Sequence, residues 1–121
     1  MPAKLNRKSY EHAQELIVDR RIVSDERDDW SEHRPSSMDE NAFIATHGWR
    51  AYARWHLGVD ETRPRRTKAH YTFPYGDFQD VHRCALLSAG SRASQHGYRD
   101  VARAVTHLNA MLEFARDRAG R

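Results

Sequence analysis

Histidine is the residue type that points most directly to chemistry in this chain. Neutral imidazole is the commonest protein ligand of zinc and similar ions, and the sequence holds eight histidines in 121 residues. They stand singly at positions 12, 33, 47, 56, 70, 82, 96 and 107, without a His-Glu-x-x-His or a Cys-x-x-Cys motif. The best metal constellation would gather His47, His56 and His82 with Asp77 or Glu32. Alternatively, these histidines hydrogen-bond buried backbone or cap helix ends.

Nucleophilic chemistry has weaker support in the sequence. Ser88 to Ser91 resembles a nucleophile elbow only superficially, because the segment falls within a predicted helix and not on a strand-to-helix turn. Cys84 could pair with His82, but two residues apart on a helix they should point roughly 200° apart around the axis. We therefore expect Cys84 to be a small buried hydrophobic residue.

The acidic residues between positions 25 and 32 could attract a hard cation, but they lack the spaced pattern with a central glycine of a calcium loop. We expect a solvated acidic face from Asp25, Glu26, Asp28, Asp29 and Glu32.

Basic residues give the clearest case for a macromolecular partner. Residues 1–60 carry 9 Lys and Arg against 11 Asp and Glu, whereas residues 61–121 carry 11 against 6. Phosphates would be attracted to the second half, and such binding would depend strongly on salt. The candidate contacts are Arg63, Arg65, Arg66 and Lys68 in a basic loop, and Arg92, Arg99 and Arg103 on a helical surface. Alternatively, these arginines serve only solubility. The sequence contains no motif of the known nucleic-acid-binding folds.

Length and composition indicate one small domain. Hydrophobic residues make up 39% and charged residues 31% of the chain, and the mean hydropathy is −0.91, which suggests a thin core beneath a charged shell. No stretch reaches the roughly 20 apolar residues that cross a bilayer. The lone cysteine cannot form an intrachain disulfide, and we expect a cytoplasmic protein without a cofactor.

The periodicity predicts a mainly α-helical domain of four to five helices at residues 9–117, between a flexible basic arm at 1–8 and a flexible tail at 118–121. Ser9 is the expected cap of the first helix, and Ser37 with Glu40 forms the pattern of a capping box before a second helix. That helix should break or bend at Gly48. A further short helix carrying Trp49, Tyr52 and Trp55 should end at Gly58.

The second half of the chain contains the clearest helical patterns. Residues 71–73 should form a short extended piece, followed by a turn and a helix capped by Asp77 that ends at Gly97. The last helix is amphipathic, with apolar residues from Val101 to Ala115 on one face. The short joint at Gly97 predicts that the last two helices form an antiparallel hairpin.

Three segments together form a signature: Trp30-Ser-Glu-His33, His47 to Gly58, and Phe73 to Arg83. The chain thereby resembles a family of small uncharacterised bacterial proteins that share WSEH, HGW/WHLG and FPYGDF/VHR segments ahead of a C-terminal helical hairpin. The resemblance covers most of residues 10–113. It implies one intact domain and carries no assigned activity, ligand or catalytic residue.

From these features we expect a non-enzymatic accessory or binding protein, whose partner is nucleic acid or protein contacted through the basic half. It could also form a homo-oligomer. The alternative is a metal-dependent or small-molecule-binding enzyme that uses the histidines near the FPYGDF turn.

Overall fold

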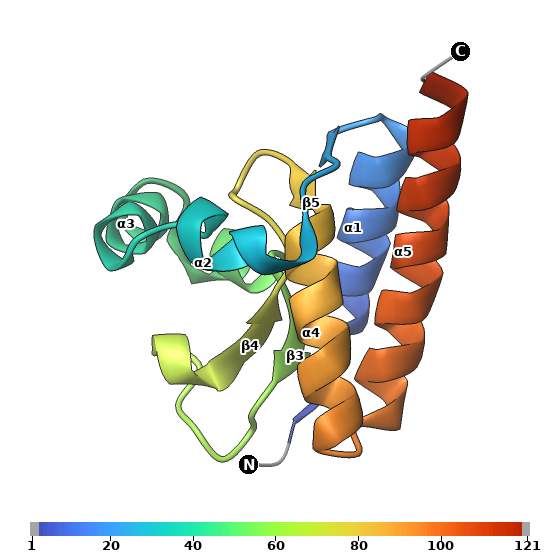
Figure 1. The fold of residues 1–121 in the computed structure, drawn as a ribbon. Helices are drawn as coiled ribbons and strands as arrows, with labels where there is room; N and C mark the ends of the chain where they lie inside the picture. Colours follow the sequence, from blue (N-terminus) through green and yellow to red (C-terminus); the bar gives the residue numbers. More distant parts are fainter. Residues whose placement is uncertain (1–2, 120–121) are drawn as a thin grey trace.

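A computed structural model describes residues 3–119 and confirms a mainly helical chain. Two small sheets accompany the helices (Figure 1). Within the described residues the α-helices are α1 (Arg7–Val18), α2 (Trp30–His33), α3 (Ser37–Ala53), α4 (Arg83–Gln95) and α5 (Arg99–Ala119). The strands are β1 (Lys4–Leu5), β2 (Ile22–Val23), β3 (His56–Val59), β4 (Tyr71–Pro74) and β5 (Val81–His82). Short 3₁₀ turns occur at η1 (Arg27–Asp29) and η2 (Lys68–His70).

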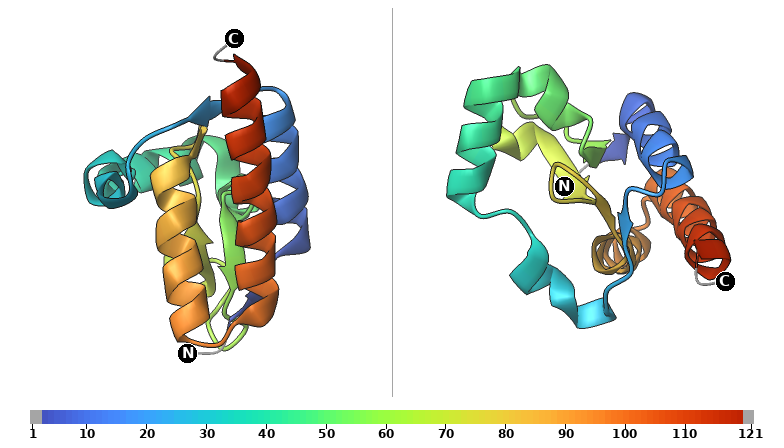
Figure 2. Two further views of the ribbon diagram at one scale, coloured as in Figure 1. Left: turned by 45° about the vertical axis from the view of Figure 1, so that its right-hand side comes forward. Right: turned by 90° about the horizontal axis from the view of Figure 1, so that it is seen from above.

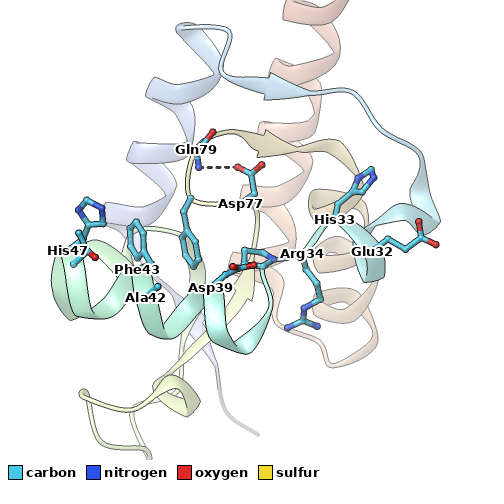
Figure 3. Close-up of a pocket in the computed structure, with 12 residues that line it drawn as sticks. Glu32, His33, Arg34, Asp39, Ala42, Phe43, His47, Asp77 and Gln79 are labelled. Atoms are coloured by element: carbon cyan, nitrogen blue, oxygen red, sulfur yellow. Dashed lines mark hydrogen bonds between the residues drawn. The ribbon is translucent and has the colours of Figure 1, made fainter.

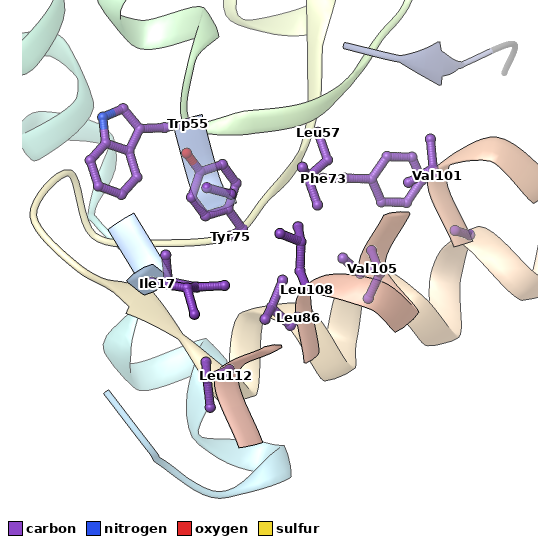
Figure 4. Close-up of a cluster of buried hydrophobic side chains, with 14 residues drawn as sticks. Ile17, Trp55, Leu57, Phe73, Tyr75, Leu86, Val101, Val105, Leu108 and Leu112 are labelled. Carbon is purple, nitrogen blue, oxygen red and sulfur yellow. The ribbon is translucent and has the colours of Figure 1, made fainter. Parts of the chain in front are cut away.

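Helices α1, α4 and α5 lie side by side and cover one face of the strands β3 and β4 (Figures 1 and 2). Helices α4 and α5 run in opposite directions and are joined at Gly97, whose φ of 73° falls in the left-handed region that glycine tolerates. The core between these layers is apolar and aromatic (Figure 4). Its largest members are Ile17, Trp55, Leu57, Phe73, Tyr75, Leu86, Leu108 and Leu112.

The three-stranded sheet has the order β1-β3-β4 and is antiparallel throughout. The expected helix from Trp49 to Gly58 is therefore wrong over its second half, because residues 56–59 are a strand. Gly58 pairs with Thr72, and a Cβ at Gly58 would lie 2.5 Å from the Thr72 hydroxyl oxygen. Glycine is thus required here for close strand packing and does not end a helix.

The N-terminal arm is also corrected over its described part. Lys4 pairs with Val59 in the sheet, and the Asn6 side chain caps α1 by accepting a hydrogen bond from the Ser9 amide. Ser9 is buried inside the helix instead of capping it, with its hydroxyl donating to the Arg54 carbonyl. Residues 1–2 lie outside the described part of the chain. At the other end α5 continues to Ala119, and residues 120–121 of the expected tail lie outside the description.

Helix α3 begins with a capping box formed by Ser36 and Asp39, one residue before the expected pair. Gly48 interrupts its helical geometry with φ 85° and ψ 173°, so the chain kinks there as predicted and then resumes the helix. Helix α3 lies across the strands from α1 and α5 (Figures 1 and 2), whereas α2 contacts α4.

The greatest departure from the expected elements lies between Asp77 and His82. Asp77 caps a tight turn instead of a helix, because its side chain accepts from the amides of Gln79 and Asp80. The chain then forms β5, which pairs in parallel with β2, placing Val23 opposite His82. Helix α4 begins only at Arg83. His82 is therefore in a strand and Cys84 in the first turn of a helix, an arrangement that positions the site described next.

No helix among residues 3–119 is long and apolar enough to cross a membrane.

Candidate metal centre

Asp25 organises a polar cluster at the junction of β2, β5 and α4. It lies in the connector between β2 and η1 (residues 24–26), where the pairing of β2 with β5 brings it against the first turn of α4. The backbone amide of Cys84 donates to Asp25 Oδ1 at 2.7 Å, and Arg83 Nη1 donates to the Asp25 carbonyl at 3.0 Å. A carboxylate at a helix N-terminus is favourable because the free amides there carry partial positive charge. These hydrogen bonds fix the connector to α4. Asp25 is therefore buried, whereas it was expected to belong to a solvated acidic face.

The second carboxylate oxygen of Asp25 accepts from three side chains. His33 Nδ1 and His82 Nδ1 each lie 2.7 Å from Asp25 Oδ2, and Cys84 Sγ lies 2.9 Å from it. The donors come from the end of α2, from β5 and from the start of α4. Asp25, His82 and Cys84 are buried, whereas His33 is exposed. Four groups that bind metals therefore meet at one point.

His82 is held on both sides. Its Nε2 donates to Asp77 Oδ2 at 2.9 Å, and the Trp30 ring lies 5.8 Å from the imidazole, centre to centre. Trp30 packs with Cys84 and Ala85 in a small apolar cluster that covers the buried side of the site. Asp77 thereby fixes the orientation of the imidazole and leaves Nδ1 directed at Asp25.

The hydrogen bonds also set the charges of the site. Burial alone would raise the pKa of Asp25, but hydrogen bonds from Cys84, His33 and His82 outweigh it and hold the pKa well below its ordinary value. Burial and the neighbouring Asp25 carboxylate raise the pKa of the Cys84 thiol. The hydrogen bond to Asp25 raises the pKa of His33. The metal-free cluster is therefore a buried carboxylate surrounded by protonated donors.

An open cavity of about 610 Å³ adjoins the cluster between α2, α3 and the turn after Asp77 (Figure 3). His33 and Asp77 belong both to its wall and to the cluster. The stacked rings of Phe43 and Phe78, 4.2 Å apart, form another part of the wall. Phe78 has a φ of 71°, a strained conformation for a side chain of its size. The cavity and the cluster thus share His33 and Asp77, which lie between them.

The expected histidine triad does not form. His47 is exposed on α3, where its ring lies 4.7 Å from that of Phe43. His56 is buried in β3 and donates through Nδ1 to the Tyr52 carbonyl at 2.9 Å. Of the three predicted ligands, only His82 enters the cluster, and Asp77, which was offered with Glu32 as an alternative further ligand, contacts His82 as a hydrogen-bond acceptor. His47 and His56 are separated from it because residues 56–59 extend as a strand instead of continuing the helix.

The sequence did not predict Asp25, His33 and Cys84 as ligands: Asp25 and Cys84 were considered for other chemistry and discounted, and His33 was not singled out among the histidines. The prediction that His82 and Cys84 face apart assumed one helix through both, whereas the strand-to-helix transition at Arg83 turns both toward Asp25. The available signal was the β-branched Val81 beside His82 after a Pro-Tyr-Gly-Asp turn, which is compatible with a short strand.

The predicted basic contacts differ in their surroundings. Arg63, Arg65 and Arg66 are exposed between β3 and η2, and Arg99 and Arg103 are exposed on α5. Lys68 instead binds Ser37 and forms an ion pair with Glu40. Arg92 lies over the Phe73 ring at 5.2 Å. Contact with nucleic acid through these residues stays a prediction.

Comparison of the chain with protein-family models, curated proteins and solved structures found no match.

Proposed function

We propose that this protein binds a divalent transition-metal ion, with Zn²⁺ as the best fit, through Asp25, His33, His82 and Cys84. The observation that carries the proposal is the convergence of four ligand atoms, one from each side chain, within 4.8 Å of one another. Of the two functions expected from the sequence, this supports the metal-dependent alternative, with a different set of ligands.

The chemistry of the donors favours zinc. Imidazole nitrogen, thiolate sulfur and carboxylate oxygen are its usual protein ligands, at about 2.0–2.3 Å in tetrahedral geometry. Atoms at the corners of such a tetrahedron are roughly 3.3–3.7 Å apart. The three donors lie 2.7–2.9 Å from Asp25 Oδ2, and the four ligand atoms lie within 4.8 Å of one another. A bound ion therefore requires that carboxylate to rotate outward and the more widely spaced donors to move closer together.

The surroundings of His82 give independent support. Histidines that bind metals usually donate their other ring N–H to a carboxylate, which fixes the tautomer and raises ligand basicity. Asp77 supplies that carboxylate to Nε2, opposite the Nδ1 atom that faces the cluster. The ion would replace the thiol proton of Cys84 and the Nδ1 protons, so binding should release protons.

The same geometry argues against a cysteine nucleophile. The Cys84 side chain is fully buried, and its thiol donates to a carboxylate and not to an imidazole base. Burial and Asp25 raise its pKa, the reverse of what an activated thiolate requires.

The test is titration of the metal-free protein with Co²⁺, a spectroscopic substitute for Zn²⁺. The wild type should bind one ion per chain and show a thiolate-to-cobalt charge-transfer band. Cys84→Ser should lose that band, and His82→Ala should bind at least about tenfold more weakly. The matched control is His96→Ala, which removes an exposed histidine at the end of α4, away from the cluster.

Circular dichroism should show that each variant is folded. Absence of a charge-transfer band in the folded wild type, or equal Co²⁺ binding by the wild type and His82→Ala, would overturn the proposal. The cluster would then be a hydrogen-bond network that fastens the connector to α4.

A further inference from the structure

The four proposed ligands differ sharply in exposure. The side chain of His33 is 38% exposed, against 7% for His82 and 5% for Asp25, and Cys84 is fully buried. Three ligands are thus sealed beneath Trp30 and α4, and one faces solvent. An ion held by them would be reached from the His33 side.

His33 is also the ligand least constrained by its surroundings. It is the last residue of the single-turn helix α2, after which Arg34 adopts extended geometry and Pro35 follows. Among the described residues, the His33 side chain hydrogen-bonds only to Asp25. By contrast, His82 is held by two carboxylates, and Asp25 is held through both its backbone and its side chain. His33 can therefore move away at smaller cost than the other three.

The space into which His33 would move is the cavity of about 610 Å³ (Figure 3). A cavity of this size holds a small organic molecule. It extends from His33 and Asp77 to the rings of Phe43 and Phe78. A ligand in it could approach the ion at one end and rest on aromatic surface at the other.

Charge restricts the class of that ligand. The Asp25 carboxylate and a Cys84 thiolate would together balance a divalent ion, which leaves little attraction for an anion. The cavity wall adds three carboxylates, from Glu32, Asp39 and Asp77, against one guanidinium from Arg34. The surroundings of the ion therefore favour neutral or cationic molecules.

We infer that the metal centre is open to exchange: a neutral or cationic small molecule with a nitrogen or oxygen donor enters this cavity and takes the place of His33 on the ion. The inference rests on the proposed metal binding. It assigns the site to the class in which three protein ligands hold the ion and the fourth position serves a ligand, as distinct from a closed structural site.

The experiment uses Co²⁺-loaded protein and two small probes: imidazole as a neutral nitrogen donor and azide as an anion. Imidazole should change the visible cobalt spectrum of the wild type while the thiolate band persists. In His33→Ala the fourth position is already vacant, so imidazole should act at a concentration at least about tenfold lower. Azide should act more weakly than imidazole on both proteins, and His96→Ala should match the wild type.

The outcomes separate the two proposals. A thiolate-to-cobalt band that neither probe perturbs, in the wild type or in His33→Ala, would establish a closed site and overturn the inference while metal binding stands. A stronger response to azide than to imidazole would overturn the assigned ligand class. Absence of the cobalt band altogether would overturn metal binding and, with it, this inference.

Discussion

Two histidines of similar burial, His56 and His82, show how the neighbours of an imidazole change what it can do. His56 is 3% exposed and His82 is 5% exposed. His56 lies against the aromatic ring of Tyr52 and hydrogen-bonds a backbone carbonyl, and burial lowers its pKa to about 4. His82 lies between two carboxylates and beside a thiol. The first is a neutral structural group, and the second has the partners of a metal ligand.

The largest expected effect on stability comes from removing Asp25, whose carboxylate accepts the hydrogen bonds of the cluster. Asp25→Ala would leave the buried donors of His82 and Cys84 without a partner, and we expect it to cost about 3–5 kcal/mol of the free energy of unfolding. Urea denaturation of the metal-free protein measures this cost. Asp25→Asn keeps an acceptor oxygen and should cost less. Equal stability of Asp25→Ala and the wild type would mean that the cluster does not hold the connector.

Lowering the pH should reduce the free energy of unfolding through His56. Because the pKa of His56 is lowered to about 4 from 6.5, the unfolded chain takes up a proton at a higher pH than the folded chain. The stability due to neutral His56 is thus present above about pH 6.5 and is lost as the pH falls to about 4. The loss amounts to about 3 kcal/mol.

Urea denaturation of the wild type and His56→Asn across this range measures the contribution, since asparagine keeps a donor for the Tyr52 carbonyl but does not titrate. The variant should lack this component of the pH dependence. An NMR titration in which His56 protonates near pH 6.5 would contradict the prediction.

A smaller effect, on metal affinity, is expected from Asp77, which contacts Nε2 of His82. Asp77→Ala removes the acceptor of its Nε2 proton, and loss of such a partner commonly weakens metal affinity 10- to 100-fold. Competition between the protein and a chelator measures that affinity. Asp80→Ala is the control, because Asp80 lies in the same turn but pairs with Arg21. Equal losses in both variants would assign the effect to the turn and not to His82.

The smallest effect is expected at His47. Its side chain is exposed and contacts the Phe43 ring, so His47→Ala should change the free energy of unfolding by less than about 0.5 kcal/mol. Metal affinity should also be unchanged. A loss of metal binding in this variant would restore His47 to the ligand set and remove the contrast drawn above.

Local sequence patterns were sufficient for some elements of the fold. The amphipathic stripe from Val101 to Ala115 lies in α5. Helix α3 kinks at Gly48, the residue at which a break or bend was expected. The Ser-x-x-acid pattern located the start of α3 to within one residue. These features depend on neighbours in sequence, through periodicity, capping and backbone freedom, and can therefore be deduced without the tertiary structure.

The strands were decided by distant partners. The segment around Trp55 has helical spacing, yet residues 56–59 pair with β1 on one side and β4 on the other. The two-residue strand at Val81–His82 depends on pairing with β2 and on a bridge between Val81 and Gly76. Such short strands carry little signal of their own, since their stability comes from pairing and burial.

The sequence by itself determined a mainly helical chain and a set of potential metal ligands. Only the tertiary structure decided which ligands meet. Asp25 lies 57 residues from His82 and 59 from Cys84 along the chain, and the parallel pairing of β2 with β5 brings them into contact. The change from strand to helix at Arg83 turns His82 and Cys84 toward the same oxygen. Periodicity within one segment cannot specify a site whose parts are assembled by contacts between segments.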